Sequence, residues 1–167
     1  MTNEAAGVRP GISDEALGWV GREWQLPGEA VTASGILRHT SATGDESPLY
    51  RDPEVAAEFG CSAIVAPPLM YMALTRPIVP LAELTIDGVT NDRRPPVGAG
   101  RAVAGDISIE FVRPLQVGDQ IVGYRRLISL EDKVGKSGQL VVANWETEYR
   151  DQEGRVVIRE HSSLILY

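Results

Sequence analysis

The stretch PPLMYMALTR, residues 67–76, decides the fold, because nearly every side chain from Leu69 to Leu74 is apolar. A helix that is apolar all round is a buried helix. The two leading prolines suit its first turn, where amide protons lack intrahelical partners, and Pro77 ends it. The pattern therefore predicts a central helix that the rest of the chain must cover.

The sequence changes character near residue 100, where strand patterns begin. In residues 105–114, Ile107, Ile109 and Phe111 alternate with polar side chains, which is typical of a strand with one buried face. Three more strand-like segments follow, at residues 119–130, 139–149 and 154–167, and the turn-rich segments 131–138 and 150–154 separate them.

Four consecutive strands with short polar connections predict an antiparallel meander. An early strand near residues 29–33 would complete the sheet. The expected fold class is α+β, with a strongly bent antiparallel sheet wrapped around the central apolar helix.

Short helices are expected before the central one. Asp52 is a plausible N-cap, with Pro53 at the first helical position and Gly60 just past the end. Ser34 could cap a helix over residues 34–44. A further short helix is expected in residues 13–24, whose two tryptophans could pack on the sheet or on a partner.

Length and composition describe one compact domain, since the chain has 167 residues and is 43% hydrophobic. We divide it into an N-terminal extension, residues 1–28, and a main domain, residues 29–167. The single cysteine, Cys61, excludes an internal disulfide and fits a reducing compartment. The sequence shows neither a signal peptide nor a membrane span, so a soluble cytoplasmic protein is expected.

Acidic residues are concentrated at the start of the chain. Residues 1–60 carry 10 acidic and 4 basic side chains, within a net charge of −7 for the whole chain. General nucleic-acid binding needs a basic field, so it is not expected. Arg93, Arg94 and Arg101 could still capture a phosphate, or could be solvated loop residues.

Three segments together carry a resemblance to a known family. They are ATGDESPLYRDPEVAAEFG at residues 42–60, IVAPPLMYMA at 64–73 and ISIEFVRPLQVGD at 107–119. Their order and spacing resemble the hotdog-fold acyl dehydratases and hydratases of the MaoC type, especially the fatty-acid-synthase-type dehydratase branch. The resemblance covers about residues 29–167 and implies a single hotdog fold.

The resemblance also implies a site. In the hydratases of this type an Asp and a His activate and hold the water that adds to a 2-enoyl thioester, while amides at the start of the central helix bind the thioester oxygen. Asp45 stands at the Asp position and Tyr50 at the His position, and both are candidate catalytic residues. The candidate substrate-binding residues are Ser47, Ala66, Pro67, Pro68, Leu69, Arg93 and Arg94.

Two departures from the family pattern weaken that site. A phenol, with an ordinary pKa of about 10, can hydrogen-bond a water but accepts a proton poorly at neutral pH, so Tyr50 is expected to line the site rather than transfer the proton. Ala66 and Pro67 stand where the catalytic members have a His-Gly pair, and proline has no amide proton to give. Loss of one such donor costs about 2.7 to 4 kcal/mol of transition-state stabilisation.

Several functions remain open. The chain could be a hydro-lyase subunit acting on 3-hydroxyacyl or 2-enoyl thioesters of coenzyme A or a carrier protein, or a non-catalytic subunit that binds them. A hotdog thioesterase is a third, less favoured reading. The resemblance implies a homodimer or a heterodimer with a second hotdog chain, and no cofactor or metal is expected. Without the family, Asp45 after Gly44 would be an ordinary turn or capping aspartate.

Overall fold

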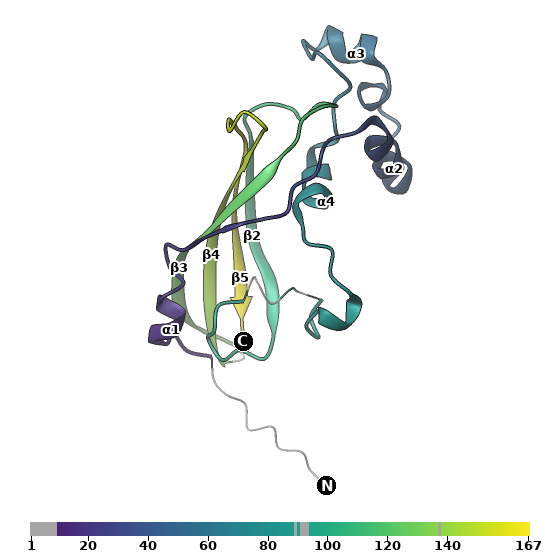
Figure 1. The fold of residues 1–167 in the computed structure, drawn as a ribbon. Helices are drawn as coiled ribbons and strands as arrows, with labels where there is room; N and C mark the ends of the chain where they lie inside the picture. Colours follow the sequence, from purple (N-terminus) through teal and green to yellow (C-terminus); the bar gives the residue numbers. More distant parts are fainter. Residues whose placement is uncertain (1–9, 89, 91–93, 137) are drawn as a thin grey trace.

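A computed structural model of the protein describes residues 10–88, 90, 94–136 and 138–167. Its main feature is a five-stranded antiparallel sheet in the order β1-β3-β4-β5-β2, with helices on one face and beyond one end (Figure 1). The strands are β1 (Glu23–Gln25), β2 (Ala102–Phe111), β3 (Val122–Gly135), β4 (Gly138–Arg150) and β5 (Val156–Leu166). The helices are α1 (Asp14–Leu17), α2 (Ala33–Thr43), α3 (Pro53–Glu58) and α4 (Tyr71–Thr75), and the 3-10 turns are η1 (Pro48–Tyr50), η2 (Pro68–Met70) and η3 (Leu81–Glu83).

The expected α+β class is confirmed, but the meander is only partly right. Strands β3, β4 and β5 follow one another as neighbours, whereas β2 pairs with β5 at the far edge instead of with β3. The connection of residues 112–121 therefore crosses the end of the sheet. Sequence periodicity gives the face of a strand but not its neighbour, which is why this crossing was missed.

Three local expectations are also corrected. The segment 131–138 is mostly strand, because β3 continues to Gly135, which pairs with Gly138. Residues 29–33 form no strand, since only Ala30 makes an isolated bridge, and the early strand is β1 instead. The cap of α2 is Thr32, whose Oγ1 accepts from the amide of Gly35 at 3.0 Å, and not Ser34.

The helix after Asp52 is confirmed. Asp52 caps α3 by accepting a hydrogen bond from the amide of Glu54 at 2.8 Å, and Gly60 follows with a positive φ of 76°. A glycine avoids the steric cost of that left-handed conformation.

The central helix is present but is not buried all round. The turn η2 runs directly into α4, and Tyr71 and Leu74 pack against the sheet. On the opposite side Leu69 is 56% exposed and Ala73 is also exposed. The sheet lies along one side of this short helix only. The expectation of a helix buried on all sides is therefore wrong for this chain alone.

The N-terminal tryptophans lie on the sheet. Trp24 of β1 contacts Trp19 at 5.1 Å and Trp145 of β4 at 5.5 Å between ring centroids. Both belong to a second apolar cluster at the end of the sheet away from α3. The proposed boundary at residue 28 stays a prediction. Strand β1, which lies in the N-terminal extension, pairs with β3 of the main domain.

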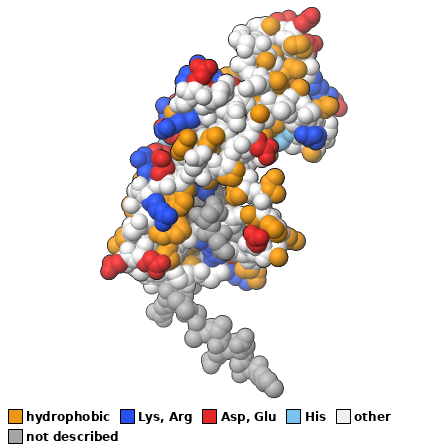
Figure 2. Space-filling view, viewed as in Figure 1, with side chains coloured by type: hydrophobic (Ala, Val, Ile, Leu, Met, Phe, Trp, Pro, Cys, Tyr) orange, Lys and Arg blue, Asp and Glu red, His pale blue; other side chains and the backbone are white. Residues whose placement is uncertain are grey.

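The two sheet edges differ. Strand β1 is short, whereas β2 is ten residues long and most of its side chains are exposed, Val103 and Ile107 among them. Figure 2 shows further exposed hydrophobic side chains gathered over α2 and α3 and over the segment that follows α4, which includes Leu37, Phe59, Ile78 and Leu81. In the described part of the chain, no helix is both long and apolar enough to cross a membrane.

Candidate functional site

A cavity of about 350 Å³ lies at the start of the central helix. Tyr50 enters it from η1, Pro67 and Pro68 form one wall, and Phe111 and Val112 at the end of β2 form another. Ala66 is part of the same lining, with Leu49, Val65, Arg113, Pro114 and Leu115. We call this the Tyr50 cavity. Its side-chain walls are mostly apolar.

The loop before Tyr50 explains how the tyrosine reaches this place. Helix α2 ends at Gly44 in the left-handed conformation, and Asp45 then turns the chain by accepting a hydrogen bond from the amide of Ser47 at 3.1 Å. Arg51 donates to the backbone carbonyl of Asp45 at 3.1 Å. These contacts lead directly into η1, whose last residue is Tyr50.

Asp45 lies near Tyr50 but outside the cavity wall. Both residues are half-buried, and neither Asp45 nor Ser47 belongs to the lining of the Tyr50 cavity. Burial, and secondarily the negative charge of Asp45, raise the pKa of the Tyr50 phenol above its ordinary value. Tyr50 therefore remains protonated at neutral pH and can donate a hydrogen bond, but it is a poor proton acceptor.

Backbone hydrogen bonds fix the helix start against the connection after β2. The amide of Ala66 donates to the carbonyl of Leu115 at 2.8 Å, and the amide of Val117 donates to the carbonyl of Ile64 at 2.9 Å. The next two residues are prolines and have no amide proton. The backbone of this wall thus gives shape rather than hydrogen-bond donors at those two positions.

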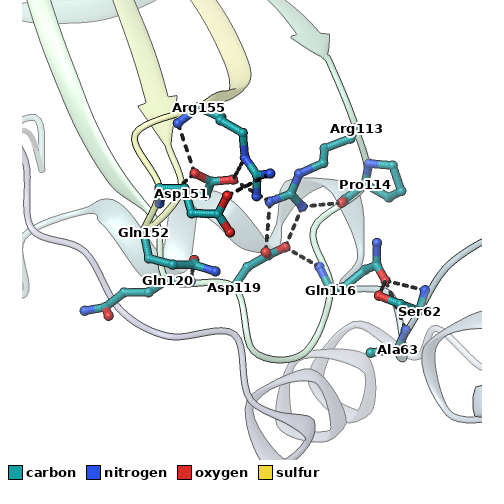
Figure 3. Close-up of polar contacts among 11 residues, drawn as sticks. Ser62, Ala63, Arg113, Pro114, Gln116, Asp119, Gln120, Asp151, Gln152 and Arg155 are labelled. Carbon is teal, nitrogen blue, oxygen red and sulfur yellow. Dashed lines mark hydrogen bonds and ion pairs between the residues drawn. The ribbon is translucent and has the colours of Figure 1, made fainter.

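A cluster of charged side chains supports that connection (Figure 3), and one of them, Arg113, also lines the Tyr50 cavity. Arg113 makes two hydrogen bonds to the carboxylate of Asp119, at 2.7 and 2.9 Å, and a third to Asp151 at 3.1 Å. Arg155 donates to Asp151 at 2.9 Å. We call these four residues the arginine–aspartate clamp. It fastens the turn after β2 to the turn between β4 and β5.

The clamp extends to the helix start through Gln116. Asp119 accepts from the amide of Gln116 at 2.8 Å, and the side-chain oxygen of Gln116 accepts from the amides of Ser62 and Ala63 at 2.8 and 3.0 Å. Asp119 closes the turn after β2, where its amide donates to the carbonyl of Gln116 at 3.0 Å. Its contacts with Arg113 and Gln116 also connect it to the wall of the Tyr50 cavity.

Asp151 is the most protected carboxylate of the clamp, with a side chain that is 0% exposed. Burial by itself raises the pKa of Asp151, but the amide of Arg155 and the guanidinium groups of Arg113 and Arg155 outweigh it and hold the pKa at about 2. The carboxylate is therefore ionised throughout the neutral range.

The remaining candidate residues lie elsewhere. Leu69 points outward and does not line the Tyr50 cavity. Arg94 donates to the carbonyl of Ala99 at 3.2 Å, in the loop that leads to the other end of β2, about 30 Å away at 3.3 Å per strand residue. Arg93 lies outside the described residues, and phosphate binding by this pair stays a prediction.

Both histidines, which the structure describes, lie outside the lining of the Tyr50 cavity. His39 belongs to α2, and His161 is an exposed residue of β5 with its Nδ1 4.0 Å from Glu146. Within the described residues there is also no group of three or more His, Cys, Asp or Glu side chains arranged to hold a metal ion.

Sequence reasoning missed several residues of the cavity. Phe111, Val112 and Arg113 belong to a motif that the sequence already set apart, but it gave no reason to place them beside Tyr50. Their place depends on the pair of backbone hydrogen bonds between residues 64–66 and 115–117. Only a three-dimensional structure shows these bonds, so the sequence carried no signal for them.

Comparison with known proteins gives a consistent result. The model of a family described as "FAS1-like, dehydratase domain region" matches residues 18–160. A UPF0336 protein of Thermobifida fusca is 29% identical over 152 residues, which are 89% of this chain and 91% of that protein. A UPF0336 protein of a Parafrankia species is 30% identical over 130 residues, covering 78% of this chain and 79% of the relative.

Solved structures show the hotdog fold. The HadBC (3R-hydroxyacyl-ACP dehydratase) complex from Mycobacterium tuberculosis contains a chain with a TM-score of 0.64 and 22% identity, covering 88% of this chain and 96% of that one. The (R)-hydratase from A. caviae gives a TM-score of 0.61 at 20% identity, with 89% and 96% of the two chains covered. The expected single hotdog fold is thereby confirmed.

Proposed function

Because the chain belongs to the family of FAS1-like dehydratase domain regions, we propose that it is one subunit of a two-hotdog unit that hydrates 2-enoyl thioesters or dehydrates 3-hydroxyacyl thioesters. The thioester is carried by coenzyme A or by a carrier protein. A soluble, cytoplasmic location is part of the same proposal.

One observation carries this proposal. Tyr50 and the proline-led helix start meet in one apolar cavity that is bordered by the end of the exposed edge strand β2. An acyl chain fits apolar walls, and an unpaired strand edge favours a second chain beside it. Assembly along β2 would place groups of the partner chain next to the Tyr50 cavity.

The roles within the unit follow from the chemistry of each side chain. Water addition to a 2-enoyl thioester requires a base for the water proton, an acid for the substrate carbon and donors for the thioester oxygen. Tyr50, with its raised pKa, can orient a water or a carbonyl oxygen by donating a hydrogen bond. Asp45 is the nearby carboxylate, and a second hotdog chain with a complete Asp and His pair supplies the proton transfers.

The relatives support the idea of a partner without identifying one. The HadBC structure is described as a complex of a 3R-hydroxyacyl-ACP dehydratase. A non-catalytic, thioester-binding subunit is the alternative, and the absence of both histidines from the Tyr50 cavity lining favours it among the described residues. The two functions share the same cavity and differ in whether side chains of this chain, such as Tyr50, contribute to turnover by the assembled unit or only bind the thioester.

Equilibrium binding tests the shared claim. Val112 lines the cavity and is 49% exposed, so Val112→Trp should fill the cavity without disturbing the core. Val134→Trp is the matched control, since Val134 is 89% exposed at the hairpin between β3 and β4. We expect dodecanoyl-coenzyme A to bind the wild type and the control alike, and the Val112 variant at least about tenfold more weakly, which is about 1.4 kcal/mol. Equal binding by all three proteins would contradict the proposed location.

A further inference from the structure

A second cavity, of about 400 Å³, lies at the other end of the same helix. Arg76 and Pro77, just after α4, form one side, and residues 104–107 at the start of β2 form another. The Tyr50 cavity is bounded by the opposite ends of the same two elements. Both cavities therefore lie along one seam between the central helix and β2, which run side by side in Figure 1.

The floor of the second cavity is polar. Arg125, Thr147 and Glu160 are paired across β3, β4 and β5, so they form one row on the inner face of the sheet. They are 6%, 0% and 3% exposed. We call this row the polar band. It separates the two apolar clusters of the core, and its Arg125 and Glu160 line the cavity.

The polar band has hydrogen-bonding capacity to spare. Tyr71 and Tyr149 both donate to the same oxygen of Glu160, Oε2, at 2.7 and 3.1 Å. Among the described residues, the buried hydroxyl of Thr147 has no hydrogen-bond partner. Buried polar groups are normally satisfied, so this hydroxyl indicates a missing polar partner beside the second cavity.

Strand β2 is shaped to border this chamber. Its pairing with β5 is interrupted between Ala104 and Ile107, and the amide of Asp106 there donates to the side chain of Ser163 at 2.8 Å. A side chain at Gly105 would collide with the same serine oxygen. Bulges of this kind are frequent beside binding sites, where they redirect the strand edge.

The charges of the cavity select the chemistry of its ligand. Two arginines, Arg76 and Arg125, line it together with two acids, Asp106 and Glu160, so the charges of its described lining residues cancel. A carboxylate would be repelled by Glu160 and an ammonium group by Arg125. A hydroxyl group is neutral and both donates and accepts, so it can donate to a carboxylate of the lining and accept from a guanidinium.

We propose that the second cavity binds a hydroxyl group carried on the acyl chain far from the thioester. This rests on the proposed function, with the chain entering through the Tyr50 cavity and continuing along β2. The step from Phe111 to Ile107 spans about 13 Å at about 3.3 Å per residue, so the hydroxyl lies well beyond the carbons that react. The preferred substrates are then long acyl thioesters hydroxylated near their far end.

A pair of probes that differ by one hydroxyl tests this inference. Binding of ω-hydroxydodecanoyl-coenzyme A and dodecanoyl-coenzyme A is measured by calorimetry on the wild-type protein. We expect the hydroxylated thioester to bind about tenfold more tightly, as a hydrogen bond to a buried charged group provides. Equal affinity of the two probes would overturn the inference and leave the proposed function intact, whereas binding of neither would overturn both.

Two variants connect the preference to the cavity. Glu160→Gln keeps the shape of the polar band but removes the negative charge of Glu160. It should reduce the ratio of the two dissociation constants, for the plain and the hydroxylated thioester, to less than about threefold. Because this buried change could impair folding, Ala104→Phe is made in parallel: Ala104 is exposed and lines the cavity, so a larger side chain closes it without touching the band. If a folded Ala104→Phe variant still preferred the hydroxylated thioester as strongly as the wild type, the hydroxyl group would not bind in the second cavity.

Discussion

The two ends of the central helix hold their polar groups in opposite ways. At the start, Asp119, Asp151 and Gln116 lie outside the lining, Arg113 is its one charged residue among those described, and the Tyr50 cavity presents mainly apolar surface. At the end, charged groups line the second cavity, and one of them, Glu160, accepts a hydrogen bond from Tyr71, the first residue of α4. If the two proposals hold, the first end accepts an acyl chain without reading its substituents, while the second end recognises a hydroxyl group on that chain.

The largest expected effect breaks the clamp. Arg113→Ala leaves Asp119 and the fully buried Asp151 without their shared cation. Loss of a buried partner costs up to about 5 kcal/mol, but Arg113 is 30% exposed, so we expect the free energy of unfolding to fall by about 2 to 3 kcal/mol.

Urea unfolding followed by circular dichroism measures this change. Arg159→Ala is the matched control, because Arg159 makes a single ion pair with Glu110 at an exposed position. It should unfold like the wild type. A clamp variant as stable as this control would show that the helix start does not depend on the clamp.

A smaller effect is expected at the other end of the helix. Tyr71→Phe removes one of two hydrogen bonds to Glu160 and keeps the buried ring, so the free energy of unfolding should fall by about 1 to 2 kcal/mol. Tyr124→Phe is the control, since the Tyr124 ring packs against Arg150 at 4.9 Å and the ring is retained. Equal stability of the two variants would contradict a role for the polar band in holding the helix.

Acid should weaken the clamp through Asp151. The folded-state pKa of Asp151 is about 2, below its ordinary value of 3.8. The stabilisation from this carboxylate is therefore complete above about pH 4 and is lost as the pH falls toward 2. Thermal melting at intervals from pH 5 to pH 2 should show a steeper decline for the wild type than for Asp151→Asn, and parallel declines would exclude Asp151 as a source of acid sensitivity.

The smallest change is expected at Asp45. Its carboxylate is half-buried and accepts one backbone hydrogen bond, from Ser47. Asp45→Ala should therefore alter the free energy of unfolding by less than about 0.5 kcal/mol in the same urea experiment. A larger loss would mean that Asp45 supports the loop, and the variant could then not serve as a test of chemistry.

Local signals in the sequence predicted local structure well. Asp52, Pro53 and Gly60 mark the bounds of α3 because a cap, a first-turn proline and a left-handed glycine each act within one turn. The choice between Thr32 and Ser34 as the cap of α2 was open to error, since two hydroxyls stand two residues apart and lie 3.3 Å from each other.

Features that depend on strand order were not predictable. Arg125, Thr147 and Glu160 come from three strands, and only the register shows that they form one row. The place of β2 beside β5 likewise depends on pairing between distant segments. Tyr50 and residues 66–68, which the family resemblance grouped as site residues, line one cavity, whereas the location of Arg94 and the exposure of Leu69 required the three-dimensional structure.

The central claim is that this chain supplies only part of an acyl-thioester site and needs a second hotdog chain for the chemistry. The most direct test follows the enoyl absorbance of crotonyl-coenzyme A with the pure protein and with Asp45→Ala, both checked for fold and for mass in solution. We predict no hydration by the wild type above that of the variant. Hydration by the pure wild-type protein that is lost in Asp45→Ala would contradict the claim, because it would place a complete site, with Tyr50 in place of the histidine, in this chain alone.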